Sequence, residues 1–147
     1  MMKSMNKYRN SKETPLFRKS EVLFNYHRAK DKVRETNSVI VMEGFMAVIR
    51  AYSVGIKNCI ATMGTNLAKE QFQAIKRLSN NVILCYDGDN AGREATLKNI
   101  ESFYKAGVNV KVIELTDNLD PDEYINKNED DTPNINLLNI CRLSLKK

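Results

Sequence analysis

The stretch that decides the fold is Val82-Ile83-Leu84-Cys85-Tyr86-Asp87-Gly88-Asp89. Its apolar run predicts a buried strand, and side chains that alternate along a strand put Asp87 and Asp89 on the same side. Two carboxylates at such close range repel one another unless a cation lies between them. Carboxylate oxygens are the ligands that Mg²⁺ and Mn²⁺ prefer, so we expect a metal site at the end of this strand.

A second acidic residue stands in an equivalent place upstream, because Glu43 directly follows the apolar run 39–42. Apolar runs and amphipathic segments alternate through the chain and predict strands at 39–42, 59–62, 82–86 and 108–115, with helices at 44–52, 67–78 and 91–105 and from 121 onward. This order predicts an α/β fold with a mostly parallel four-stranded sheet and helices on both faces. Ligands bind at the carboxyl ends of such strands, where Glu43, Asp87 and Asp89 fall, followed one connection later by Asp120 and Asp122.

The 147 residues fit one ordinary domain, and we see no repeat or linker that would mark a second. No apolar run is long enough to span a membrane and the first residues lack the core of a signal peptide, so we expect a cytoplasmic protein without a membrane partner. We divide the chain into a basic arm and helix at 1–37, a sheet domain at 38–130 and a tail at 131–147 whose pattern predicts no element. Within the first part, Val22, Tyr26, Ala29 and Val33 recur at helical spacing and predict a helix over 17–36.

Charge is spread unevenly along the chain. Residues 1–37 hold ten Lys and Arg against four Asp and Glu, a net charge of +6, whereas residues 38–147 hold thirteen against fourteen, a net charge of −1. A basic arm beside clustered acids suits an enzyme that acts on nucleic acid, with phosphates on the arm and metal on the acids. A solvated basic helix explains the same charges equally well.

Four motifs in order resemble the Toprim domain of bacterial replicative DNA primases. They are the stretches at 41–46 (VMEGFM), 61–65 (ATMGT), 85–92 (CYDGDNAG) and 120–125 (DPDEYI), and the segment 7–17 resembles what precedes the primase Toprim core. The resemblance covers about residues 7–128. A lone Asp-x-Asp would be weak support for a family, but four ordered motifs make a specific signal.

The resemblance implies a role for each matching residue. Glu43 would be the general acid or base, and Asp87 and Asp89 would hold Mg²⁺ or Mn²⁺, with Asp120 and Asp122 as further metal carboxylates. The reaction would join ribonucleoside triphosphates on a single-stranded DNA template, and the full-length family would also contact the replicative helicase. Basic residues that the resemblance makes candidates for template contacts are Lys7, Arg9, Arg18 and Lys19. Without the resemblance, the pattern Asp120-Pro121 favours a simple helix cap.

The chain departs from the family pattern at residue 47, in its extent, and in the tail after about residue 130, which shows no confident match. Ala47 stands where the family has an aspartate, four residues after Glu43, and its presence predicts weaker metal binding. The chain also lacks the Cys and His ligands of a zinc module, most of the basic subdomain and a helicase-binding region. We therefore expect an isolated chain that makes little or no primer. An inactive nucleic-acid-binding remnant and another Toprim enzyme, such as a nuclease, remain as alternatives.

Overall fold

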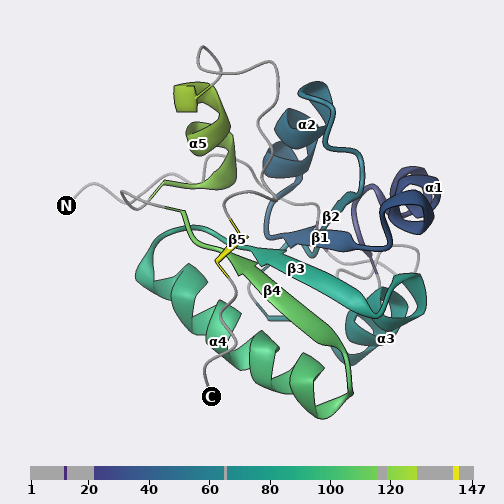
Figure 1. The fold of residues 1–147 in the computed structure, drawn as a ribbon. Helices are drawn as coiled ribbons and strands as arrows, with labels where there is room; N and C mark the ends of the chain where they lie inside the picture. The colour runs from purple at the N-terminus through teal and green to yellow at the C-terminus, as the bar shows by residue number, and fades with distance from the viewer. Residues whose placement is uncertain (1–11, 13–21, 65, 116–118, 129–140, 143–147) are drawn as a thin grey trace.

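A computed structural model describes residues 12, 22–64, 66–115, 119–128 and 141–142 (Figure 1). Its elements, in chain order, are α1 Tyr26–Thr36, β1 Val39–Met42, α2 Phe45–Ser53, β2 Cys59–Ala61, α3 Lys69–Leu78, β3 Asn81–Cys85, α4 Asn90–Lys105, β4 Asn109–Ile113, α5 Pro121–Asn128 and β5 Cys141–Arg142. In the part of the chain that is described, no helix combines the length and the apolar character that crossing a membrane requires.

The five strands form one sheet in the order β2-β1-β3-β4-β5. Neighbours among the first four are parallel, which confirms the predicted α/β fold with a mostly parallel four-stranded sheet. The two-residue strand β5 adds an antiparallel edge to β4, in a tail for which the sequence predicted no element. β1 has the predicted boundaries, those of β2 and β3 differ by one residue, and β4 is shorter at both ends than the predicted 108–115.

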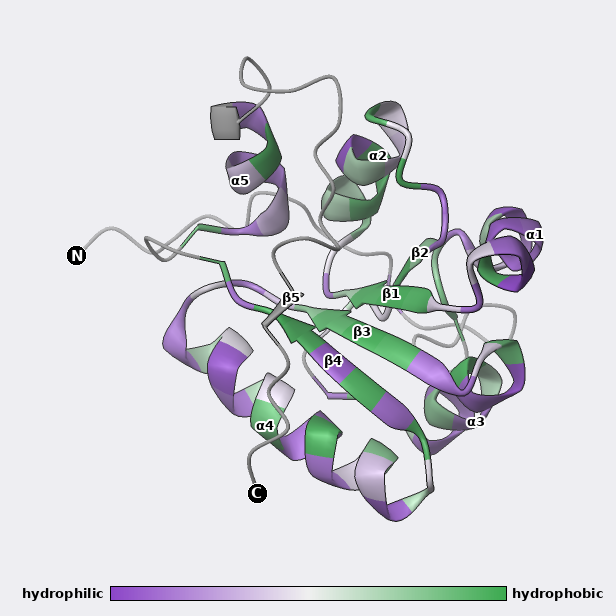
Figure 2. Ribbon diagram, viewed as in Figure 1, coloured by the Kyte–Doolittle hydropathy of each residue, from purple (hydrophilic) through white to green (hydrophobic). Residues whose placement is uncertain are grey.

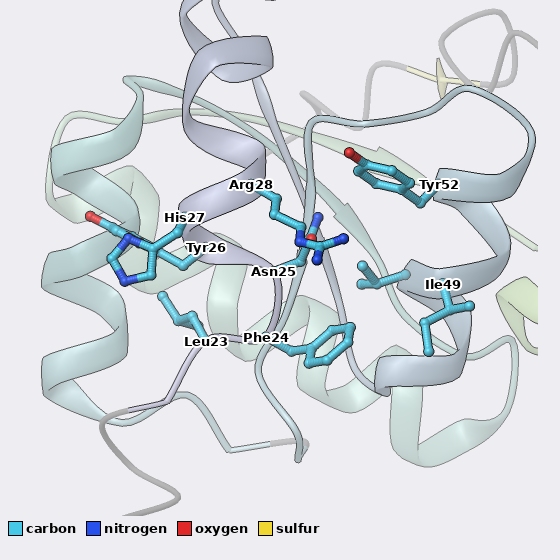
Figure 3. Close-up of a pocket in the computed structure, with 9 residues that line it drawn as sticks. Leu23, Phe24, Asn25, Tyr26, His27, Arg28, Ile49 and Tyr52 are labelled. Carbon is cyan, nitrogen blue, oxygen red and sulfur yellow. The ribbon is translucent and has the colours of Figure 1, made fainter.

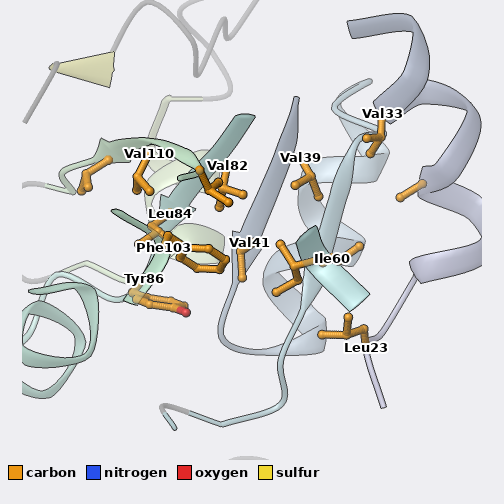
Figure 4. Packing of buried hydrophobic residues seen from close by; sticks show 14 of the residues in the cluster. Leu23, Val33, Val39, Val41, Ile60, Val82, Leu84, Tyr86, Phe103 and Val110 are labelled. Atoms are coloured by element: carbon orange, nitrogen blue, oxygen red, sulfur yellow. The ribbon is translucent and has the colours of Figure 1, made fainter. Parts of the chain in front are cut away.

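Helices cover both faces of the sheet, as predicted. Alternate residues of β1 face opposite sides: Val39 and Val41 pack with α1, α3 and α4, whereas Ile40 and Met42 pack with α2 and α5. Figure 4 shows the first of these two clusters, with Phe103 of α4 between Leu84 and Val41. All four residues of β1 are buried, as a strand covered on both faces requires, and Figure 2 shows the resulting apolar centre of the sheet.

The predicted helix over 17–36 is wrong for residues 22–25, and residues 13–21 lie outside the described part. The backbone of Phe24 instead pairs with Ala61 through two hydrogen bonds of 2.9 and 3.2 Å, which covers the outer edge of β2. Asn25 has a φ of 68°, a left-handed conformation that a helix interior excludes, so α1 begins only at Tyr26. Of the residues whose spacing predicted the helix, Tyr26, Ala29 and Val33 do lie on α1, and only Val22 precedes it.

A hollow lies between the start of α1 and α2, lined by Phe24, Arg28 and Tyr52 among others (Figure 3). Phe24 packs edge-on against Phe45 with ring centroids 6.0 Å apart, so the hollow borders an aromatic contact between the two segments. None of the acidic residues predicted for the metal site lines it.

Helix α3 begins at Lys69, two residues later than predicted, with Ala68 in the N-cap position. The cap comes from inside the helix, because Gln71 Oε1 accepts a hydrogen bond of 3.0 Å from the backbone N–H of Ala68. The Gln71 amide also donates to the carbonyl oxygens of Val22 and Thr62, both at 2.9 Å. One buried side chain thus joins the segment before α1, the loop after β2 and the start of α3.

We predict that Gln71→Leu lowers the free energy of unfolding by roughly 2–4 kcal/mol, because it removes the partners of two carbonyls and one N–H in a site only 2% exposed. Urea denaturation followed by circular dichroism measures the change. The matched control is Gln73→Leu, which makes the same substitution at an exposed position of the same helix. An equal loss in both variants would mean that the Gln71 hydrogen bonds are not what stabilises this junction.

Candidate metal centre

The carboxyl ends of β1 and β3 lie at the topological switch point of the sheet, where the strand order reverses. β1 and β3 are neighbours, with Met42 paired to Cys85, but β1 connects to β2 on one side and β3 to β4 on the other. In open parallel sheets a crevice forms at such a point. Glu43 and Asp87 follow the two strands directly, so the topology brings them together from positions far apart in the sequence.

The turn between β3 and α4 holds Asp87 and Asp89 in different settings. Asp87 is half-buried, whereas Asp89 is exposed and is the N-cap of α4, where its Oδ1 accepts a 2.7 Å hydrogen bond from the N–H of Gly92. Gly92 lies so close to the turn that a Cβ atom at this position would overlap the carbonyl oxygen of Asp87. Glycine is therefore required where the first turn of α4 meets the strand end.

A second segment, residues 119–123, comes to the same place. The N–H of Gly88 donates to the carbonyl oxygen of Leu119 at 2.9 Å and ties the turn to the start of α5. Asp120 then accepts from the N–H of Glu123 at 2.8 Å, and Glu123 accepts from the N–H of Asp120 at 3.1 Å. This reciprocal pair is a capping box, so Asp120 does cap a helix, and it does so beside Asp87.

Asp122 is engaged elsewhere. Its Oδ1 lies 3.1 Å from Nε of Arg50 on α2, and the two side chains are 20% and 34% exposed. The pair links α2 to α5 across the face that these helices share. The metal role of Asp122 therefore stays a prediction. To bind a cation at the centre, the Asp122 carboxylate would have to break its ion pair with Arg50.

Negative charge and burial act together on Asp87. They raise the pKa of its carboxyl from 3.8 to about 7, with burial as the largest cause, followed by the charges of Glu43, Asp120, Asp89 and Glu123. These four carboxylates reach Asp87 from three separate segments of the chain. The sequence analysis included three of them and missed Glu123, although the pattern Asp120-x-x-Glu123 could have indicated a capping box that brings it there.

The pKa of Glu43 is also raised, first by burial and then by the charge of Asp89, while a hydrogen bond with the backbone of Asp87 acts in the opposite direction. The loop after β2 fixes the backbone here. The N–H of Met63 donates to the carbonyl oxygen of Glu43 at 2.8 Å, with Met63 in a left-handed conformation at a φ of 64°. The loop after β2 thus fixes the backbone of Glu43, whose role as general acid or base stays a prediction.

The arrangement suits a hard divalent cation by the chemistry of its donors. Glu43, Asp87, Asp89 and Asp120 supply only carboxylate oxygens, and the charge of neighbouring carboxylates adds to burial in raising the pKa of Asp87 and of Glu43. In this conformation, however, no three acidic, His or Cys side chains of the described residues lie close enough to hold one ion together. Like-charged carboxylates repel, which favours this wider spacing.

Of the remaining predicted site residues, Lys7, Arg9, Arg18 and Lys19 lie outside the described part of the chain. Ala47 occupies the first turn of α2, where it is 6% exposed and packs in the apolar cluster under α2 and α5.

A cavity of about 590 Å³ opens beside Asp87 and Gly88, between α4 and the end of β4, and Arg93 and Thr96 supply polar groups to its wall. The sequence analysis did not predict this cavity.

Comparison with known proteins places the chain in a family. The profile of Toprim-like proteins matches residues 40–125, which include Glu43, Asp87, Asp89, Asp120 and Asp122. The DNA primase of Staphylococcus aureus (strain COL) is 46% identical over 121 residues, which are 82% of this chain and 20% of that protein. The chain therefore spans about a fifth of the length of the curated relatives it matches.

Solved structures agree with the fold. The zinc-binding and RNA polymerase domains of the Aquifex aeolicus primase are 35% identical, with a TM-score of 0.76 over 86% of this chain and 32% of that one. A primase catalytic domain bound to single-stranded DNA is also 35% identical, with a TM-score of 0.73 over 84% of this chain and 40% of that one. The predicted resemblance to the primase Toprim domain is confirmed.

We predict that Gly92→Ala weakens Mn²⁺ binding and lowers the thermal stability, because the added methyl group pushes the first turn of α4 away from Asp87. Isothermal titration with MnCl₂ and a thermal melt measure the two effects. Gly64→Ala is the matched control, since a Cβ atom there meets no atom within 4 Å. If the two variants bind Mn²⁺ equally well, the close approach at Gly92 does not shape the site.

We predict that stability in EDTA falls as the pH rises toward 7. Folded Asp87 keeps its proton up to about pH 7, whereas the unfolded chain releases it near 3.8. Between these values the folded state binds more protons, so raising the pH favours unfolding. Asp87→Asn should flatten the dependence measured by urea denaturation between about pH 4 and about pH 8. The exposed Asp31, changed to Asn, serves as the control; a slope unchanged by Asp87→Asn would contradict the assignment.

Proposed function

The chain belongs to the Toprim-like family, and from this we propose that it is the metal-binding part of a DNA primase, which joins ribonucleotides into primers on single-stranded DNA. The observation that supports the proposal most is the convergence of Glu43, Asp87, Asp89 and Asp120 at the switch point of the sheet. The similarity to primases over 82% of the chain supports the choice of reaction.

In this proposal the carboxylates of Asp87 and Asp89 hold Mg²⁺ or Mn²⁺, with Asp120 beside them and Asp122 available if it leaves Arg50. When bound, the cation neutralises triphosphate charge and orients the phosphates. Glu43 is the general acid or base, because its raised pKa and half-buried position let it accept or hold a proton near the reacting hydroxyl. The cavity beside Asp87, with Arg93 on its wall, leaves room for part of a nucleotide.

The partners follow from the same reaction. Ribonucleoside triphosphates would be the substrates and single-stranded DNA the template, which the basic residues Lys7, Arg9, Arg18 and Lys19 would contact. One relative of known structure was solved with single-stranded DNA. In the full-length family the replicative helicase would be a further partner, and the compartment would be the cytoplasm.

A second candidate function rests on Ala47. A chain that keeps the fold but lacks one carboxylate could bind nucleic acid without catalysing primer synthesis. We expect the isolated chain, which spans 20% of the primase it resembles, to make little or no primer by itself. Robust primer synthesis by this chain alone would overturn that expectation, whereas nicking of supercoiled DNA in Mg²⁺ without nucleoside triphosphates would favour a nuclease.

The metal role is tested by titrating the full chain with MnCl₂ in a calorimeter. Asp87→Asn combined with Asp89→Asn should abolish the binding isotherm, because both changes remove ionised oxygen ligands from the centre. The control pair is Asp31→Asn with Glu70→Gln, two exposed acids on α1 and α3 that make the same change in charge. Equal Mn²⁺ binding by both pairs would exclude the proposed centre.

We predict that Ala47→Asp strengthens Mn²⁺ binding and lowers stability in EDTA. Position 47 is buried in the first turn of α2, four residues after Glu43. An aspartate there would add a fifth carboxylate to the four of the proposed centre, which already repel one another, and a bound cation would offset this repulsion. Calorimetry and denaturation with and without MnCl₂ measure both effects, with Ala47→Asn as the uncharged control. If Mn²⁺ affinity does not change while stability falls in both variants, position 47 does not belong to the metal site.

A further inference from the structure

A groove of about 480 Å³ separates α3 from the second half of α4, away from the carboxylates. Lys69, Lys98 and Lys105 line it, and no acidic residue does. Lys98, Ser102 and Lys105 are spaced four and three residues apart, so they lie along one face of α4, opposite Lys69 on α3. The two helices thus present a strip of positive charge around a single depression.

Little of this charge is balanced by the described part of the chain. Lys105 lies 2.7 Å from Glu101, but this pair is exposed, at 72% and 68%, and contributes little. Among the described residues, neither Lys69 nor Lys98 lies within 4.0 Å of a carboxylate. The strip therefore carries a net positive charge that a polyanion can use.

The groove also has an aromatic wall. Phe72 lines it and is only partly buried, with its other side stacked on Phe103 at a centroid distance of 4.7 Å and an angle of 28°. This stacking fixes the ring in place. A positively charged groove with a fixed aromatic side chain and a hydroxyl group is the combination that single strands use, with phosphates on the lysines and a base against the ring.

We propose that the groove between α3 and α4 binds single-stranded nucleic acid through its phosphates. A continuous strand suits an arrangement in which Lys98, Ser102 and Lys105 follow one helix, because backbone phosphates repeat at regular intervals along it. Asn99 lines the groove as well, and its amide donates a buried 2.8 Å hydrogen bond to the hydroxyl of Tyr86, the residue before Asp87. Helix α4 therefore runs from the metal centre to the groove, and the hydrogen bond between Asn99 and Tyr86 connects the groove to the strand end that precedes Asp87.

The inference goes beyond the proposed function, because it assigns a strand contact to a surface that contains none of the predicted template-binding residues. It does not depend on a metal. Binding can therefore be measured in EDTA, so a failure of this proposal leaves the Mn²⁺ titration unaffected, and a failure of the metal centre leaves the groove intact.

The test measures the fluorescence anisotropy of fluorescein-labelled oligothymidylate with the full chain in EDTA at several salt concentrations. Lys69→Gln combined with Lys98→Gln should weaken binding about tenfold at low salt and lower the slope of log affinity against log salt by about 1.4, the value for two phosphate contacts. The control pair, Lys57→Gln with Lys111→Gln, changes two exposed lysines outside the groove and should leave the slope nearly unchanged.

Two outcomes would overturn the proposal. Equal weakening by both pairs would mean that binding follows the net charge of the chain and not this groove. Displacement of the oligonucleotide by polyglutamate at the same charge concentration would identify the groove as a site for acidic proteins. Chemical acetylation of lysines gives a local measure: bound oligothymidylate should protect Lys69 and Lys98, but not Lys57, and circular dichroism confirms that each variant folds.

Discussion

Repulsion between carboxylates at the end of β3 is the constraint that the surrounding structure has to overcome. Burial and four neighbouring acids raise the pKa of Asp87 to about 7. The segments that carry these acids are held in place by backbone hydrogen bonds. The bonds from Gly88 to Leu119 and from Met63 to Glu43 join backbone groups only. Because such bonds do not depend on protonation, they keep the acidic segments together whether or not the carboxylates are ionised.

Three helices begin at this edge of the sheet, and their ends partly compensate the negative charge. α2 begins two residues after Glu43, α4 directly after Asp89 and α5 directly after Asp120. The positive end of a helix favours a nearby anion, so acids can gather here at a lower cost than elsewhere on the surface. Capping and metal binding are therefore compatible roles: Asp89 uses Oδ1 for the N–H of Gly92, and its second oxygen is not used by that cap.

The sequence predicted the sheet well because its strands are buried on both faces and read as continuous apolar runs, as in Val39–Met42 and Val82 to Cys85. Positions that depend on contacts between distant segments could not be predicted. The pairing of Phe24 with Ala61 shortened the expected helix at its start, and α3 begins two residues later than expected, where Gln71 accepts from the N–H of Ala68. At the site, the sequence supplied the acids, but only the fold shows that Asp122 faces Arg50 and that Glu123 reaches Asp87.

Metal affinity and metal-free stability are opposed in a centre of this kind. Each carboxylate added near Asp87 raises the repulsion that a cation can remove, and it also destabilises the fold without the cation. Two features of this chain limit that charge: Ala47 is neutral, and Arg50 balances Asp122. Both lie on the α2 and α5 face, where Ala47 packs among apolar residues. The same two features that ease the folding of the metal-free chain should therefore limit how tightly it holds a divalent cation.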